Sequence, residues 1–145
     1  MKVNEPSVIV KQEFKQPIEI VWNAITDVTQ MRLWFFDNIP AFEARVGFKT
    51  EFDVATEHHT FPHLWKITEV IPQQKIVYNW TYKGFQGDSY VTFQLSEKNN
   101  QTQLTLTTKV VKDFPDDIPE FKRESCLAGW NYFIKTSLVN YLSNL

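Results

Sequence analysis

The chain has 145 residues, with 15 Lys and Arg against 17 Asp and Glu, and a formal net charge of -2 at pH 7. This length suits a single domain, expected to span residues 1–145, and it can bury a core without disulfides or metals. The nearly balanced charge argues against nucleic-acid binding. The single cysteine excludes an intramolecular disulfide and a cysteine-based zinc cluster. No apolar run resembles a signal peptide or a membrane span, so we expect a cytoplasmic protein with no membrane partner.

The N-terminal part predicts one strand followed by two short helices. Residues 7–15 alternate between apolar and charged side chains, which is typical of a half-buried strand. Pro17 suits the first turn of a helix. Apolar residues then recur at helical spacing, at Ile18, Val21, Trp22 and Ile25. Asp27 precedes Gln30 by three residues, a pattern that resembles a capping box and predicts a second short helix.

The pattern changes to a period of two between Phe42 and Lys112. Apolar and polar residues alternate in successive runs, and each run ends in turn residues such as Pro62, Pro72 or Gly84. Consecutive strands with short connections form an antiparallel meander. We therefore predict six strands in this part of the chain.

The C-terminal segment predicts one long amphipathic helix of about 25 residues. Asp117, with Glu120 three residues later, is expected to cap its start. Its apolar face is expected to contain Trp130, Phe133, Ile134, Leu138, Tyr141 and Leu142. Gly129 lies inside the helix at a cost of about 1 kcal/mol relative to alanine. We therefore expect either a bulky group close to Gly129 or a bend in the helix.

Strands in the middle of the chain and helices at its ends indicate an α+β fold. The long helix has to lie across one face of a twisted sheet. A straight helix cannot contact a curved sheet along its whole length, and the space left between them favours an apolar ligand cavity.

The chain resembles the START-like superfamily, also called SRPBCC. Within it, the chain is most similar to the family named for the activator of the 90-kDa heat-shock chaperone's ATPase. The matching stretches are Pro17–Asp27, Trp34–Phe35, Val46–Phe52, Trp65–Pro72, Lys75–Trp80, Val91–Leu95 and Gly129–Trp130. The resemblance implies a helix-grip fold, in which a curved antiparallel sheet of seven strands surrounds the C-terminal helix and two short helices follow the first strand. Members include chaperone activators, carriers of hydrophobic ligands and polyketide cyclases, so the resemblance does not select one function.

The three histidines, His58, His59 and His63, lie within six residues, and imidazole is a common ligand of zinc and copper. However, Pro62 interrupts the helical spacing that a paired site on one helix face needs, and no cysteine is near. We therefore expect hairpin residues at the mouth of the cavity, with no metal and no other cofactor.

The sequence contains no recognisable catalytic arrangement. The G-x-S-x-G motif of serine hydrolases is absent, and Cys126 has no histidine close to it in sequence. We expect Cys126 to be a small buried thiol between helix and sheet, and we expect the protein not to be an enzyme.

Aromatic residues provide the main functional indication, because Tyr and Trp combine a large apolar surface with a polar atom. The predicted ligand contacts are Trp65, Tyr78, Trp80, Tyr90, Phe93, Trp130, Tyr132 and Phe133. The sequence thus predicts a monomeric or homodimeric protein that binds an apolar or aromatic small molecule between its sheet and its long helix. Plain core packing is the alternative explanation for the same residues.

Two other functions stay open. The first is a protein–protein module, similar to a chaperone activator or a stress-related regulator, for which Trp34, Phe35 and Phe36 would form an exposed patch. The second is an enzyme of the cyclase or hydrolase type. It would need a buried carboxylate, such as Glu69 or Asp88, facing His63.

Overall fold

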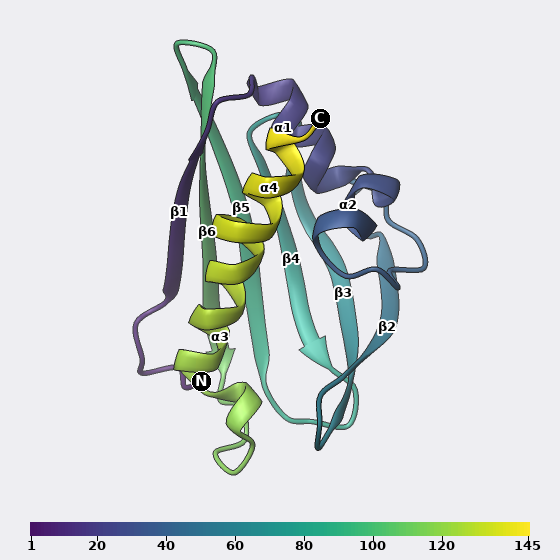
Figure 1. Ribbon diagram of the computed structural model, residues 1–145. Helices are drawn as coiled ribbons and strands as arrows, with labels where there is room; N and C mark the ends of the chain where they lie inside the picture. The colour runs from purple at the N-terminus through teal and green to yellow at the C-terminus, as the bar shows by residue number, and fades with distance from the viewer.

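A computed structural model describes all residues from 1 to 145. Its main feature is one curved antiparallel sheet with the strand order β1-β6-β5-β4-β3-β2 (Figure 1). The strands are β1 (Val8–Phe14), β2 (Lys49–Ala55), β3 (Thr60–Ile71), β4 (Lys75–Tyr82), β5 (Asp88–Lys98) and β6 (Gln101–Lys112). Consecutive strands from β2 to β6 pair as a meander, and β1 pairs with β6.

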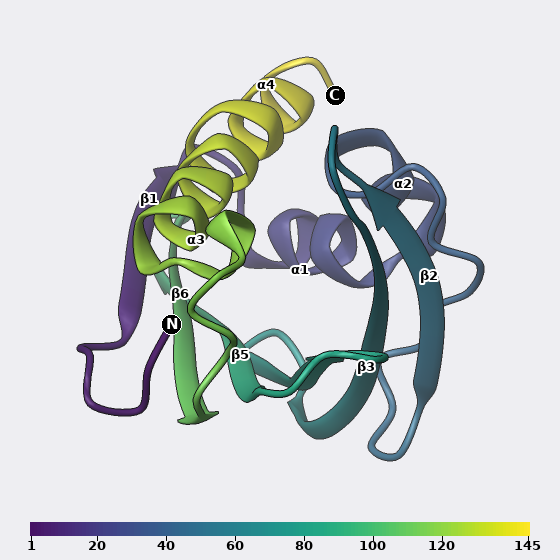
Figure 2. The ribbon, with the colours of Figure 1, turned by 90° about the horizontal axis from the view of Figure 1, so that it is seen from below.

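The helices lie against the concave face of the sheet. They are α1 (Ile18–Thr26), α2 (Val28–Trp34), the 3₁₀ turn η1 (Pro119–Phe121), α3 (Arg123–Trp130), the π-helical η2 (Asn131–Ser137) and α4 (Leu138–Ser143). Seen along the strands, the sheet forms a trough that α3, η2 and α4 cross as one continuous helix (Figure 2). This arrangement confirms the predicted α+β class and the helix-grip architecture. None of the helices is long and apolar enough to cross a membrane.

The predicted number of strands was wrong, because the sheet has six strands and not seven. Between Lys49 and Lys112 there are five strands and not six. The missing strand would have contained Phe42, which lies in a segment without regular structure. The ring of Phe42 stacks on Tyr78 with centroids 5.7 Å apart and meets Trp65 edge-on at 6.2 Å. This segment fills the core with a side chain instead of adding a strand to the sheet.

The C-terminal helix begins later than predicted. Its first residue is Arg123, and Lys122 occupies the N-cap position without a side-chain hydrogen bond, so the predicted cap at Asp117 was wrong. Pro119 starts a separate 3₁₀ turn instead. Asp27 does occupy the N-cap of α2, but its side chain makes no capping hydrogen bond.

The π-helical stretch explains which face of the long helix is buried. Its buried residues follow one another at intervals of four: Trp130, Ile134, Leu138 and Leu142. In a regular α-helix, each step of four residues turns about 40° beyond a full turn, so this row would leave the sheet. The wider turn of η2 compensates for this rotation. The helix thereby keeps one row of side chains against the sheet along its length.

Three of the predicted ligand contacts, Trp65, Tyr78 and Phe93, belong to a solid core at the end of the trough where α1 and α2 lie. Phe35, directly after α2, is at its centre. Its ring lies within 6.4 Å, centroid to centroid, of the rings of Trp34, Phe36, Trp65, Trp80, Phe93, Trp130 and Phe133. The patch expected from Trp34, Phe35 and Phe36 is therefore not exposed: Trp34 is 2% exposed and Phe35 is 8% exposed.

A second, smaller cluster holds the opposite end of the trough together, with Phe61, Phe114 and Phe121 at its centre. Gly87, just before β5, has a φ of +119°, and a Cβ atom there would overlap the ring of Phe114. We predict that Gly87→Ala lowers the free energy of unfolding by about 2–4 kcal/mol, because it combines backbone strain with overpacking. Gly84 has a φ of +85° and open space around it, so Gly84→Ala isolates the backbone cost of about 1–2 kcal/mol. Urea denaturation measures both, and equal losses would contradict the proposed packing of Phe114.

Candidate functional site

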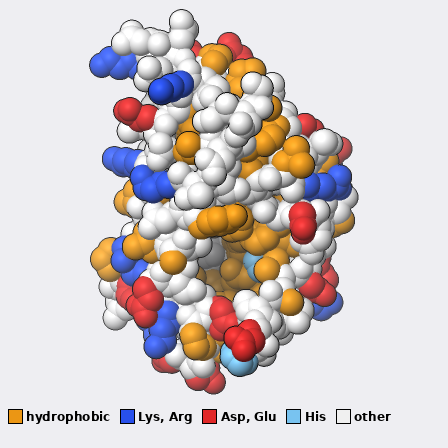
Figure 3. Space-filling view, viewed as in Figure 1, with side chains coloured by type: hydrophobic (Ala, Val, Ile, Leu, Met, Phe, Trp, Pro, Cys, Tyr) orange, Lys and Arg blue, Asp and Glu red, His pale blue; other side chains and the backbone are white.

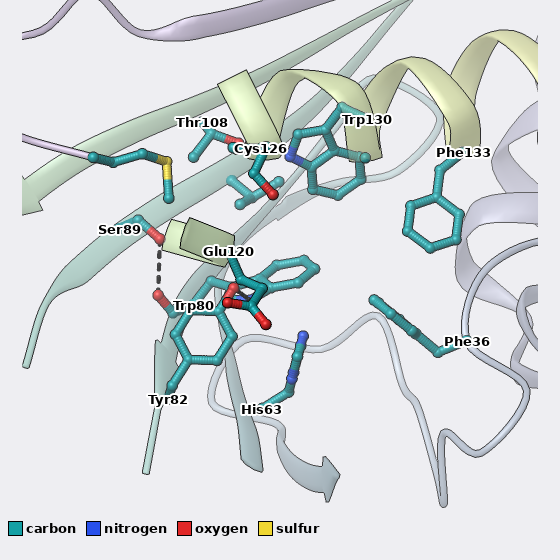
Figure 4. Close-up of a pocket in the computed structure, with 14 residues that line it drawn as sticks. Phe36, His63, Trp80, Tyr82, Ser89, Thr108, Glu120, Cys126, Trp130 and Phe133 are labelled. Atoms are coloured by element: carbon teal, nitrogen blue, oxygen red, sulfur yellow. Dashed lines mark hydrogen bonds between the residues drawn. The ribbon is translucent and has the colours of Figure 1, made fainter. Parts of the chain in front are cut away.

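A cavity of about 130 Å³ lies between the sheet and the first half of the long helix. Its walls come from β3, β4, β5 and β6 on one side and from α3 and η2 on the other. Phe36, from the loop after α2, separates it from the solid core, and Glu120 of η1 lies at its open side (Figure 4). On the surface, the mouth is a hollow bordered by hydrophobic side chains, with histidine atoms visible inside it (Figure 3).

Three of the eight predicted ligand contacts line this cavity: Trp80, Trp130 and Phe133. Three others lie in the solid core, each at most 2% exposed: Trp65, Tyr78 and Phe93. The remaining two, Tyr90 and Tyr132, are 37% and 56% exposed and lie outside the cavity. Of the predicted contacts, only the first group belongs to the candidate site.

The position of Tyr90 follows from strand alternation. Tyr90 pairs with Asn79 and shares the outer face of the sheet with Thr92, whereas Ser89 and Val91 face the cavity. The alternation in the sequence already placed Tyr90 on the polar side of its strand. The prediction of Tyr90 as a ligand contact was therefore wrong.

His63 lines the cavity and is 6% exposed. Its Nδ1 lies 2.9 Å from the carbonyl oxygen of Phe61. Rings surround the imidazole, with centroids 4.8 to 5.7 Å away, from Phe36, Phe52, Trp80 and Tyr82. Burial among these rings lowers the pKa of His63 to about 4, against the hydrogen bond to Phe61 and the charge of Asp53. His63 is therefore neutral at physiological pH.

The three histidines do not form one site. His58 is exposed next to Glu57, with a nitrogen–oxygen distance of 3.8 Å. His59 Nδ1 lies 3.2 Å from the carboxylate of Glu120. The structure contains no group of three His, Cys, Asp or Glu side chains arranged to hold a metal ion.

Glu120 connects η1 to the turn between β2 and β3. The hydroxyl of Thr56 donates a hydrogen bond of 2.6 Å to its carboxylate, to which His59 also bonds. The hydrogen bond from Thr56, then a backbone hydrogen bond and then the contact with His59, hold the pKa of Glu120 below its ordinary value. Because Glu120 also lines the cavity, these bonds fix one border of the cavity mouth.

Polar side chains that the sequence analysis missed line the sheet side of the cavity. Ser89 donates a hydrogen bond of 2.8 Å to the carbonyl oxygen of Trp80, and Trp80 Nε1 donates one of 3.0 Å to the hydroxyl of Tyr82. Thr108 is 4% exposed, and its hydroxyl has no hydrogen-bond partner. Thr108 shares a strand face with Leu104 and Leu106. A polar residue at a position where the strand is otherwise apolar is the pattern that could have indicated this part of the cavity wall.

Gly129 lines the cavity from the helix side. A Cβ atom at this position would have no protein atom within 4 Å, so the expected bulky neighbour is absent. Cavity space lies there instead. The helix continues from Gly129 and Trp130 into the π-helical stretch.

Cys126, the single cysteine, also lines the cavity. Burial raises the pKa of its thiol to about 11. Since the thiolate is the reactive form, we predict that iodoacetamide alkylates the folded protein roughly 100-fold more slowly at pH 8 than the protein unfolded in urea. Intact-mass spectrometry follows the reaction at this single site. Labelling at similar rates in both states would show that the thiol is open to water.

The sequence profile of the "Activator of Hsp90 ATPase homolog 1-like protein" family matches residues 15–143, nearly the whole chain. The chain belongs to this family. The match confirms the resemblance on which the helix-grip fold was expected. No curated protein matches the chain in sequence.

Solved structures show the same architecture. Protein CV1439 from Chromobacterium violaceum superimposes with a TM-score of 0.78 at 21% identity, covering 94% of this chain and 96% of that one. The Aha1 dimer from Colwellia psychrerythraea superimposes with a TM-score of 0.73 at 20% identity, covering 95% of this chain and 96% of that one. DynU16, described as a putative protein in the dynemicin biosynthetic locus, gives 0.75 at 24% identity, covering 96% of this chain and 48% of that one. At these identities the likeness establishes the fold alone.

Proposed function

We propose that this member of the family binds an apolar or aromatic small molecule in the cavity between its sheet and its C-terminal helix. The observation that carries the proposal is a cavity of about 130 Å³ whose walls combine Trp80, Trp130 and Phe133 with the hydroxyl of Thr108. Ligand sites typically have this composition, mostly apolar with a few polar groups that orient the ligand. The relation to DynU16 adds a neighbour whose description refers to a biosynthetic locus of a small molecule.

The proposal includes no chemical step. The carboxylates that a cyclase-type or hydrolase-type site was expected to place beside His63 have other partners. Glu69 lies 3.3 Å from the amino group of Lys75, and Asp88 accepts a hydrogen bond of 2.6 Å from Asn79. With a pKa of about 4, His63 is also a weak base at neutral pH.

The protein-partner alternative has less support. It relied on an exposed patch formed by Trp34, Phe35 and Phe36, and the first two of these are buried in the core. Phe36 is partly buried and faces the cavity. We therefore place the function in the cavity and not on this surface.

Thermal denaturation with a panel of apolar ligands tests the proposal. Toluene, naphthalene and cresols should raise the melting temperature, because a ligand at 100 times its dissociation constant stabilises the folded state by about 2.7 kcal/mol. For such small ligands we expect dissociation constants of about 10 µM to 1 mM. The fluorescence of Trp80 and Trp130 should change over the same concentration range. A panel that shifts neither signal would refute the proposal.

A further inference from the structure

Two polar groups that line the cavity are available to a ligand. One is the hydroxyl of Thr108 on β6, a residue that is 4% exposed and whose neighbour in the protein is the thiol of Cys126, a weak hydrogen-bonding group. The other is Nε2 of His63 on β3, at the end of the ring opposite the bond to Phe61. In Figure 4 this ring points upward into the space between Tyr82 and Phe36. A few polar groups in a mostly apolar cavity orient a ligand, so both are places where a ligand can form a hydrogen bond.

The hydrogen bond to Phe61 determines what His63 offers to a ligand. A carbonyl oxygen can only accept, so the proton of the neutral imidazole is on Nδ1. Nε2 is then a hydrogen-bond acceptor. The ring stays neutral at physiological pH because burial lowers its pKa to about 4. A matching ligand therefore presents a donor at this end of the cavity.

The size and charge of the cavity restrict the ligand further. The volume of about 130 Å³ is close to that of an apolar protein cavity of about 150 Å³ that binds benzene. Two charged groups belong to lining residues, and both have partners in the protein: the carboxylate of Glu120 bonds to Thr56 and His59, and the amino group of Met1 donates to the carbonyl oxygen of Phe121. Burying an unpaired charge here would be costly, so the ligand carries none.

We propose that the ligand is an uncharged, single-ring aromatic molecule whose hydroxyl group donates a hydrogen bond to Nε2 of His63. This inference rests on the binding function proposed above and specifies its ligand class. The aromatic walls formed by Trp80, Trp130 and Phe133 hold the ring. Thr108 lies three strands away from His63 in the sheet order, so its hydroxyl bonds to a second polar substituent on the far side of the ring.

Calorimetric titration with matched ligands tests the hydroxyl requirement. Para-cresol should bind the wild-type protein at least about 5-fold more tightly than para-methylanisole, in which a methyl group replaces the donated proton. Toluene should also bind more weakly than para-cresol. His63→Phe removes the acceptor and should bring the ratio between para-cresol and para-methylanisole close to one. His63→Gln retains an acceptor oxygen and should preserve part of the preference.

Thr108→Val, nearly the same in shape, is the second variant. It should weaken para-hydroxybenzyl alcohol about 5-fold and leave para-cresol unchanged, because only the former carries a second hydroxyl. Circular dichroism verifies that each variant is folded, and the comparison of ligands on the wild-type protein does not depend on any variant.

The outcomes separate this inference from the proposed function. If toluene, para-methylanisole and para-cresol bind equally well, the binding function stands and the ligand class proposed here is wrong. If no single-ring compound binds but naphthalene does, the ligand class is again wrong. If no ligand of either panel binds, both proposals fail.

Discussion

Replacing Gly129 with leucine should weaken ligand binding by at least about 10-fold, equivalent to about 1.4 kcal/mol, while the protein stays folded. Gly129 lies on the helix face that lines the cavity, together with Cys126, Trp130 and Phe133. A Cβ atom there meets no protein atom within 4 Å, so a leucine side chain has room to extend into the cavity. It would occupy the volume that the ligand needs. Titration with toluene and para-cresol measures the effect.

Gly129→Ala is the matched control. It adds a single methyl group at the edge of the cavity and removes the conformational freedom of a helical glycine. Its free energy of unfolding should rise by about 0.5–1 kcal/mol, because alanine favours the helix. The dissociation constant of the ligand should change by less than about 3-fold, which corresponds to about 0.7 kcal/mol. If leucine and alanine variants bind as tightly as the wild type, the ligand does not occupy this cavity.

The second large effect is a loss of stability in acid. Between pH 6.5 and pH 4, His63 should lower the free energy of unfolding by about 3 kcal/mol. The pKa of His63 is about 4 in the folded protein and 6.5 for the unperturbed side chain, so the unfolded chain binds the proton more readily. The free energy of unfolding is therefore unaffected by His63 above pH 6.5. It decreases as the pH falls from 6.5 to 4, because the unfolded chain takes up the proton first. At about 1.4 kcal/mol for each pH unit, the loss reaches about 3 kcal/mol.

His63→Gln isolates this contribution, because glutamine does not titrate and its amide can still donate to the carbonyl oxygen of Phe61. Urea denaturation between pH 7.5 and pH 4 should show a steeper loss for the wild type than for the variant. Carboxylates with lowered pKa values, such as Glu120 and Asp116, titrate in both proteins and cancel in the comparison. Parallel pH profiles would show that His63 is open to water in the folded protein.

The sequence predicted the faces of the elements well, because alternation and helical spacing are local patterns. It placed Trp65, Tyr78 and Trp80 on the inner side of the sheet and Trp130 on the inner side of the helix, as the structure has them. The same alternation pointed Tyr90 outward, although it was predicted as a ligand contact.

Depth in the trough could not be predicted in this way. Whether an inward aromatic residue packs in the core or lines the cavity depends on where Phe35 and Phe36 enter, and both come from a distant part of the chain. Phe35 fills the space beside Trp65 and Phe93, with ring centroids 5.6 and 6.4 Å away. Phe36 lies at the border between this core and the cavity, and its side chain forms part of the cavity wall. Packing between segments that are far apart in the chain does not produce a periodic pattern in the sequence, so it could not be predicted from alternation or helical spacing.

The polar groups of the site were partly visible. Ser89 and Thr108 are small polar residues at positions that alternation assigns to the buried face, which is a recognisable sign of a polar cavity wall. The sequence could not predict that His63 is buried and neutral, because this depends on the hydrogen bond to Phe61 and on four surrounding rings.

Native mass spectrometry of the protein purified from its own host tests the central claim most directly. We expect the wild-type protein to carry one small molecule, which is released on denaturation and is an uncharged aromatic compound with a hydroxyl group. Gly129→Leu, prepared in the same way, should show the bare protein mass. A bare mass for the wild type, with no mass shift when toluene and para-cresol are added, would contradict the claim that this cavity is a binding site.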